Sequence, residues 1–173
     1  ITRPSAGTIH FEGRPIDRLA PHEIFRRGLA RTFQTPVVFP TQTVLAHARL
    51  GALLGDPRGG RLAFRARAKA EAVAVEALAM CGLMDQQHVV AGLLTVVDRK
   101  RLMVASALAA GPRALLLDEP MGGLTAGERD QMTELVRAIH RGGVTVLLIE
   151  HVMKAVQALA SRVLVLHHGE VLA

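Results

Sequence analysis

The stretch Leu115-Leu116-Leu117-Asp118-Glu119-Pro120 decides the fold of this chain. Its apolar run, which starts at Ala114, is typical of a buried strand in a parallel sheet, and two carboxylates follow it. In α/β folds, ligands bind at the carboxyl ends of such strands. Asp118 can therefore hold Mg²⁺ through a water molecule, and Glu119 can orient or deprotonate an attacking water. The alternative is a strand that merely ends in polar residues, and the proline and glycines that follow make it less favoured.

Helices and strands are expected to alternate around this stretch. The expected order is a helix over Arg99–Ala110, a buried strand at Ala114–Leu117, a helix after Thr125, a second buried strand at Val144–Ile149, a helix over 152–159, a third strand at Val163–Leu166 and a turn at 168–170. Thr125 can cap its helix, and Glu128 would complete a capping box. This alternation predicts an α/β protein with a mostly parallel sheet and crossover helices.

The first half of the chain shows a different pattern. Its expected elements are a β-hairpin with strands at Thr8–Phe11 and Arg14–Ile16, a short helix over Pro21–Gly28, an irregular stretch over 35–61 with a flexible loop at 55–60, and an amphipathic helix from Ala70 to Cys81. Gly82 is a natural stop for that last helix. We therefore expect three parts: residues 1–34 with the hairpin and short helix, residues 35–92 as a helical subdomain, and residues 93–173 with most of the sheet.

Composition excludes several classes of protein. The 173 residues are 50% hydrophobic, which rules out a disordered chain, and no apolar run approaches the roughly 20 residues of a transmembrane helix. The single cysteine, Cys81, excludes an internal disulfide and a multi-cysteine zinc site. The net charge of +6 would permit a nucleic acid partner, but the cations are scattered and aromatic residues make up 3% of the chain, too few for a stacking platform. No nucleic acid partner is therefore expected.

Two further residues suit the same edge of the sheet. His151 follows the expected strand Val144–Ile149, where it can donate a hydrogen bond to a terminal phosphate. A lone histidine is more often a surface or capping residue, but Glu119 at the neighbouring strand end favours the functional interpretation. Gln34 can offer its amide oxygen to a metal ion or a water, although most such glutamines are simply solvated.

A fourth candidate lies at the start of a helix, in the segment Leu94–Arg101. The hydroxyl of Thr95 and the backbone N–H groups of a helix N-terminus can form an anion site. Thr95 or Asp98 as an ordinary N-cap explains the same pattern equally well. Both interpretations stay open from the sequence.

The segments that carry Gln34, Thr95, Asp118–Glu119 and His151 resemble, in this order along the chain, the nucleotide-binding subunit of ABC transporters. The resemblance is strongest to the subfamily that energises importers of branched-chain amino acids and related amides. Gly28–Gln34 is similar to the segment leading into that subfamily's Q-loop, Leu115–Pro120 to its Walker B strand, and Leu147–His151 to its switch-histidine segment. The resemblance implies a P-loop NTPase-like fold, with ATP and Mg²⁺ as cofactors. It implies that Asp118 and Gln34 serve the metal, that Glu119 is the general base, and that His151 senses the γ-phosphate.

The signature motif departs from the family pattern. The family's L-S-G-G-Q aligns with Leu94–Asp98, so that Val96 and Val97 stand where glycines are usual. A β-branched residue resists positive φ and the close approach of a phosphate. The nucleotide contacts that the resemblance implies are Thr95, Val96, Val97, Asp98 and, in the D-loop, Gly123.

The Walker A pattern G-x-x-x-x-G-K-[ST] does not occur in the sequence, because none of the three lysines follows a glycine. In the family this loop lies just before the segment that Ile1–Gly13 resembles. We therefore expect an N-terminally truncated chain, with its N-terminal part missing and with little ATP binding of its own. Without that loop, the β- and γ-phosphates would lose their main cradle.

The resulting expectation is an ATPase subunit of an ABC importer, peripheral at the cytoplasmic face of the inner or plasma membrane. It would form a head-to-tail dimer with a second ATPase subunit and dock on integral membrane permease subunits. The alternatives are a catalytically inactive fragment and an ABC-type ATPase that acts on DNA or ribosomes rather than in transport.

Overall fold

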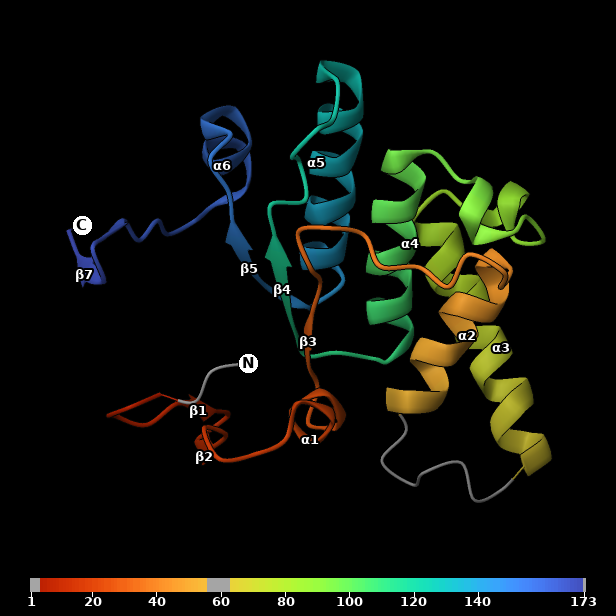
Figure 1. The fold of residues 1–173 in the computed structure, drawn as a ribbon, viewed down its shortest axis with the longest axis horizontal. Coiled ribbons are helices and arrows are strands. Elements are labelled where there is room, and N and C mark those ends of the chain that lie inside the picture. The colour runs from red at the N-terminus through yellow and green to blue at the C-terminus, as the bar shows by residue number, and fades with distance from the viewer. Residues whose placement is uncertain (1–3, 56–62, 173) are drawn as a thin grey trace.

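The computed structural model describes residues 4–55 and 63–172. Its elements are β1 (His10–Phe11), β2 (Arg14–Pro15), α1 (Pro21–Arg26), β3 (Leu29–Arg31), α2 (Val44–Gly55), α3 (Ala63–Met80), two 3₁₀ turns (Met84–Gln86 and Ala91–Leu93), α4 (Val96–Ala109), β4 (Ala114–Asp118), α5 (Ala126–Arg141), β5 (Thr145–Ile149), α6 (Met153–Leu159), β6 (Leu166–His167) and β7 (Glu170–Val171). Figure 1 shows α2, α3 and α4 gathered on one side of the central sheet. The β1–β2 hairpin, the short helix α1 and helix α6 confirm the expected elements, although the hairpin strands are shorter.

The central sheet is parallel, with strand order β3-β4-β5. Leu115 and Leu117 of β4 are completely buried, as the apolar run predicts for the middle strand. Strand β3 was not predicted, because its three residues are too few to show a periodic pattern. The expected α/β class and the two parallel strands β4 and β5 are confirmed.

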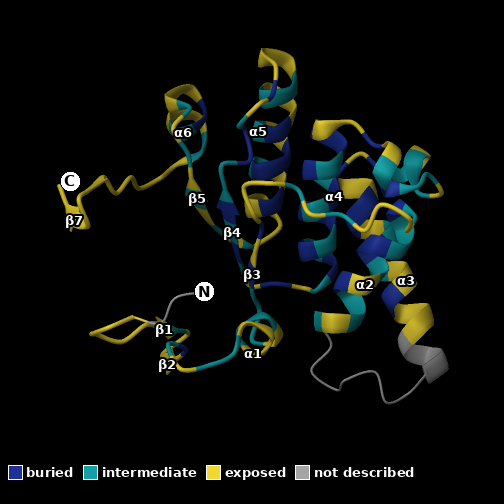
Figure 2. Ribbon diagram, viewed as in Figure 1, coloured by how far each residue is buried: buried dark blue, intermediate teal, exposed yellow. Residues whose placement is uncertain are grey.

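Strand β5 corrects the expectation of a second buried strand. It lies at the edge of the described sheet, and its burial alternates, with Leu147 55% and Ile149 50% exposed. A run of apolar residues does not reveal whether a further strand pairs beside it, so the pattern alone could not separate an edge from a centre. Figure 2 shows this half-exposed strand beside the buried β4.

The third parallel strand expected at Val163–Leu166 is wrong. Leu166–His167 instead forms β6, which pairs antiparallel with β7. The predicted turn between them is confirmed, with His168 at φ 48° and Gly169 at φ 84°. Such a two-residue turn with positive φ favours an antiparallel hairpin, and a hairpin pairs the segment locally instead of adding it to the parallel sheet.

Helix α2 corrects the expectation that residues 35–61 are irregular. The buried residues of α2 have helical spacing and are Val44, His47, Ala48 and Gly51. Because this face includes a histidine and a glycine, the pattern of hydrophobic residues does not reveal the helix. A Cβ atom on Gly51 would lie 1.9 Å from the carbonyl oxygen of Ser106 in α4. The glycine therefore permits a close crossing of α2 and α4. The flexible loop expected at 55–60 lies, apart from Gly55, outside the described residues.

Helices α3, α4 and α5 confirm the three expected helices. Helix α3 is longer than expected, and the loop after it turns at Gly82 with φ 69°. Helix α4 begins three residues before the expected Arg99, with Thr95 as its N-cap. Helix α5 has the predicted capping box between Thr125 and Glu128. Its buried residues are Met132, Leu135, Val136 and Ile139, spaced as one face of a helix.

The three expected parts of the chain are in contact with one another. Strand β3, from residues 1–34, pairs with β4 from residues 93–173, and α4 packs against both α2 and α3. The division at residues 34 and 92 stays a prediction. None of the described helices is both long and apolar enough to cross a membrane.

Candidate functional site

The carboxyl end of β4 places Glu119 in an unusual backbone conformation. Glu119 has φ 46°, in the left-handed region that non-glycine residues seldom adopt. Its N–H donates to the carbonyl oxygen of Ile149 at 2.9 Å, and its own carbonyl accepts from the N–H of Gly122 at 3.2 Å. These two bonds hold the chain in a sharp turn where β4 ends. The Glu119 side chain, 31% exposed, is thereby presented at the edge of the sheet.

Gln34 and His151 converge on the Glu119 carboxylate. Gln34 Nε2 donates to Glu119 Oε2 at 2.5 Å, and His151 Nδ1 lies 3.8 Å from Glu119 Oε1. The three residues come from the segment after β3, the end of β4 and the segment after β5. The parallel pairing of these strands brings their carboxyl ends to one edge. The structure therefore brings together Gln34, Glu119 and His151, which the sequence predicts at one edge of the sheet.

Asp118 forms an ion pair that the sequence did not indicate. Arg31, the last residue of β3, donates from its guanidinium to Asp118 Oδ2 at 2.9 Å. The guanidinium also lies 5.5 Å from the centre of the Phe33 ring. Because β3 was not expected as a strand, nothing in the sequence placed Arg31 beside Asp118.

Glu150 joins the ends of β4 and β5. One of its carboxylate oxygens accepts from the N–H of Met121 at 2.7 Å, and the other accepts from the N–H groups of His151 and Val152, both at 3.1 Å. These bonds fix the backbone on which His151 is carried. No sequence pattern indicated this role for Glu150.

Lys100 of α4 reaches the same turn from behind. Its Nζ donates to the carbonyl oxygen of Glu119 at 3.0 Å, and the residue is 6% exposed. Burial lowers the pKa of Lys100, while the nearby carboxylates of Glu150 and Glu119 act to raise it. A buried lysine paired in this way is uncommon, and no sequence pattern marked it.

The N-terminus of α4 forms a closed polar network. The Thr95 hydroxyl accepts from the N–H of Asp98 at 3.2 Å and donates to Asp98 Oδ2 at 2.8 Å. Arg101 lies 3.4 Å from the other Asp98 oxygen and donates to Gln131 of α5 at 2.5 Å. The N-cap interpretation of Thr95 is therefore observed. In this arrangement the side chains of Thr95 and Asp98 are bonded to each other, and a ligand would compete with that bond.

The remaining predicted nucleotide contacts differ in exposure. Val96 is 55% exposed, whereas Val97 is 9% exposed and its side chain belongs to the core. Gly123 is exposed in the loop between β4 and α5, with φ 73°. Their roles in binding stay predictions.

The donor set at the end of β4 fits Mg²⁺. Carboxylate and amide oxygens are the ligands that this ion takes from proteins, and it usually keeps several waters and substrate phosphates as well. Asp118 and Gln34 carry such oxygens at the ends of β4 and β3. Among the described residues, no group of three or more His, Cys, Asp or Glu side chains could hold a metal ion. Two protein oxygens suit an ion that keeps waters and substrate phosphates as its further ligands.

Comparison with known proteins relates this chain to transporter subunits. The family model described as "ABC transporter" matches residues 1–122. The high-affinity branched-chain amino acid transport ATP-binding proteins LivG of Salmonella typhimurium and BraF of Pseudomonas aeruginosa are both 34% identical, over 99% of this chain and 70% of their own length. The methionine import ATP-binding protein MetN of Symbiobacterium thermophilum is 34% identical over 99% of this chain and 50% of its own.

Solved structures show the same fold. A nucleotide-free ATP-binding cassette from an ABC transporter superposes with a TM-score of 0.84 at 25% identity, covering 99% of this chain and 70% of the other. A dimeric cassette in a post-hydrolysis state, bound to ADP and phosphate, superposes with a TM-score of 0.74 at 21% identity, covering 91% of this chain and 68% of the other. The second likeness concerns the fold alone.

Proposed function

The chain belongs to the ABC transporter family, and from that premise we propose that it is the ATP-binding and ATP-hydrolysing subunit of an importer for branched-chain amino acids or related amides. Membership of the family makes the chain a transporter ATP-binding subunit. The class of solute is the more specific part of the proposal. It is supported by the likeness to the branched-chain amino acid proteins LivG and BraF. MetN, which is also 34% identical to this chain, is a methionine import ATP-binding protein.

The convergence of Gln34 and His151 on Glu119 carries this proposal. Glu119 would accept the proton of the attacking water, because its Oε1 lies at the half-exposed edge while Oε2 is held by Gln34. Gln34 thereby orients the carboxylate toward the water. His151 can donate a hydrogen bond from its ring to a phosphate beside that carboxylate.

Asp118 and Gln34 are proposed to hold Mg²⁺, which when bound with ATP neutralises charge that develops on the phosphates. Arg31 would release Asp118 Oδ2 for this purpose, because its guanidinium occupies that oxygen. The pair is half-exposed, with side-chain exposures of 46% for Arg31 and 22% for Asp118. An exposed ion pair of this kind contributes only about 0–1 kcal/mol, so it can be replaced.

We propose that the site is completed by a second ATPase subunit in head-to-tail contact. The N-terminus of α4, with Thr95, the backbone of Val96 and Val97, and Asp98, would face the nucleotide held by the partner, as would Gly123 in the loop before α5. The exposure of Val96 and Gly123 supports such a contact.

Membrane permease subunits are the proposed partners of the segment after Gln34 and of the helical residues 35–92. Support comes from a hollow of about 420 Å³, lined in part by Phe39, His47, Leu50 and Leu53. Phe39 is 54% and Leu50 38% exposed beside it, and such apolar exposure suits a protein contact. This docking would hold the chain peripherally at the cytoplasmic face of the membrane.

Residues 1–173 by themselves are proposed to bind ATP weakly and not to hydrolyse it, because they contain no G-x-x-x-x-G-K-[ST] sequence. Titration of this chain with ATP and Mg²⁺ tests the point. Little or no binding is expected, and micromolar binding would contradict the proposal.

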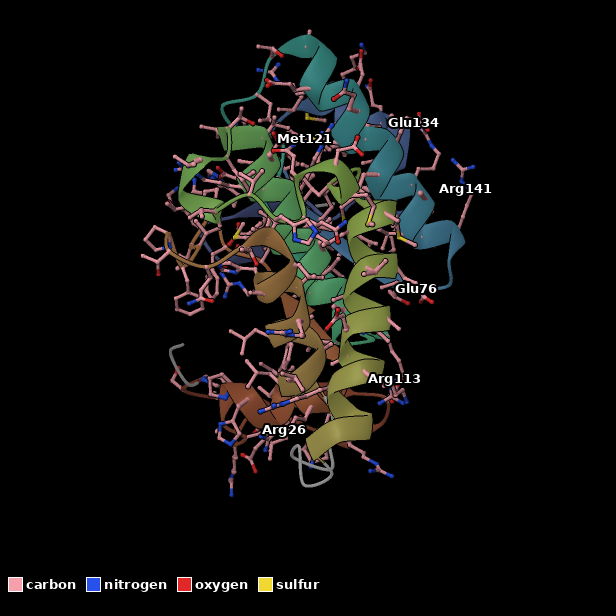
Figure 3. All side chains as sticks on the ribbon, turned by 90° about the vertical axis from the view of Figure 1, so that its right-hand side faces the viewer. Arg26, Glu76, Arg113, Met121, Glu134 and Arg141 are labelled. Atoms are coloured by element: carbon pink, nitrogen blue, oxygen red, sulfur yellow. The ribbon has the colours of Figure 1, made fainter. Side chains whose placement is uncertain are left out.

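Steady-state ATP turnover by the natural protein that contains these residues tests the proposed function. Glu119→Gln removes the proton acceptor while keeping the shape of the side chain, so a loss of at least about 100-fold is expected. Glu134→Gln is the matched control, because Glu134 lies on the exposed side of α5 (Figure 3) and pairs only with Arg137 and Arg141 among the described residues. Unchanged turnover in Glu119→Gln would show that Glu119 is not the base.

A further inference from the structure

We infer that Lys100 is a positioning residue for Glu119, which it holds through the hydrogen bond from its Nζ to the Glu119 carbonyl oxygen. This inference rests on the proposed role of Glu119 as the general base. Lys100 does not touch the reacting atoms in this arrangement. It acts on the backbone that aims the Glu119 carboxylate.

The backbone of Glu119 needs such support. A non-glycine residue in the left-handed region costs on the order of 1 kcal/mol and persists where its surroundings hold it. The N–H of Glu119 is bonded to Ile149 on the next strand, and its carbonyl is bonded to Gly122 in its own turn. Lys100 adds the bond from the α4 side, at 3.0 Å. Without the bond from Lys100, the Glu119 carbonyl would accept only from Gly122, which belongs to the same turn.

Gly122 lies beside the hydrogen bond between Lys100 and Glu119. A Cβ atom on Gly122 would lie 3.4 Å from the Glu119 carbonyl oxygen and 3.8 Å from Lys100 Nζ. Both are ordinary van der Waals distances, so this loop packs directly against the bond from Lys100 to Glu119.

The charges around the ammonium group also suit this role. Lys100 is 6% exposed, and a buried cation is costly unless it is paired. Glu119 and Glu150 are the carboxylates whose charge acts on it, and Glu150 in turn binds the backbone at Met121 and His151. The ammonium group of Lys100 thus extends from α4 to the turn at the end of β4, close to Glu119 and Glu150.

A double-mutant cycle in the natural protein tests the inference. Lys100→Met removes the N–H donors at nearly constant length, and we expect kcat for ATP hydrolysis to fall about 10- to 100-fold, with KM changed less than about twofold. Lys100→Arg keeps a donor and should recover part of the loss. If Lys100 acts through Glu119, Lys100→Met causes no further loss in a Glu119→Gln background. An equal loss in both backgrounds would overturn the inference.

A measurement on the unsubstituted protein covers the case in which Lys100→Met does not fold. The ¹³C resonance of the Glu119 carbonyl should move with the titration of the Lys100 side chain, and more than the Asp118 carbonyl, which Lys100 does not contact. A Glu119 carbonyl that stays fixed while Lys100 titrates would overturn the inference. This result does not depend on ATP hydrolysis, so it separates failure of the Lys100 bond from failure of the proposed base.

Discussion

The carboxyl edge of the sheet consists of exposed polar side chains, whereas the packed unit of α2, α3 and α4 is held by a buried apolar core. At the edge, exposed and half-exposed polar side chains from three segments meet with few bonds: Gln34 donates one hydrogen bond to Glu119, and His151 lies 3.8 Å from it. In the helical unit, buried residues such as Val44, Ala48 and Leu102 lie in one core, and helices cross closely at Gly51. The difference teaches that substitutions at the edge should change function with little loss of stability. Substitutions in the helical unit should do the reverse.

After Glu119→Gln, the largest effect is expected at the edge, from His151→Ala and Gln34→Ala. Gln34→Ala removes the donor to the Glu119 carboxylate, and His151→Ala removes the proposed donor to a phosphate. A hydrogen bond to a charged group is worth about 1.5–3 kcal/mol. ATP turnover by the natural protein should therefore fall about 10- to 100-fold. The unfolding free energy should change by less than about 0.5 kcal/mol, because both side chains are exposed.

His140→Ala is the control for these variants, since His140 is an exposed histidine in the last turn of α5. It should leave turnover unchanged. If His151→Ala and Gln34→Ala lowered turnover less than twofold, the convergence on Glu119 would have no functional meaning.

The next effect tests the helical unit through Gly51→Ala. The new Cβ atom would lie 1.9 Å from the Ser106 carbonyl, so α2 and α4 must move apart. Overpacking of this kind costs about 1–3 kcal/mol, measurable by urea denaturation. Turnover per folded molecule should stay within about twofold.

Gly127→Ala is the matched control, because Gly127 lies in α5 with no atom within 4 Å of the added Cβ. It should be neutral or stabilising by up to about 1 kcal/mol. Equal destabilisation by both substitutions would mean that the close crossing of α2 and α4 does not matter.

The smallest effect concerns Thr95, which lies where the two regions meet. Thr95→Val removes the N-cap of α4 and should cost about 1 kcal/mol of unfolding free energy, whereas Thr95→Ser keeps the cap hydroxyl. If ATP turnover per folded molecule of the natural protein also falls in Thr95→Val, Thr95 belongs to the site as well. Full stability in Thr95→Val would contradict the capping role.

The same comparison explains what could be predicted from the sequence. The carboxylates after β4 and the residue His151 after β5 were predictable, because parallel strands bring consecutive strand ends to one edge. Arg31 and Lys100 were not, because one lies on a three-residue strand and the other reaches its partner through a flexible side chain. Helix α2 was missed because its buried stripe includes His47 and Gly51. The parallel strand expected at Val163–Leu166 failed because an apolar run does not specify its partner.

The identity of the nucleotide bound by Glu119→Gln tests most directly whether Glu119 performs the chemistry. The natural protein carrying this substitution would be mixed with radiolabelled ATP and Mg²⁺, and the bound nucleotide would be separated and identified at increasing times. We predict that intact ATP stays bound long after the unsubstituted protein has converted it to ADP. Conversion to ADP at the unsubstituted rate would contradict the assignment of Glu119 as the base.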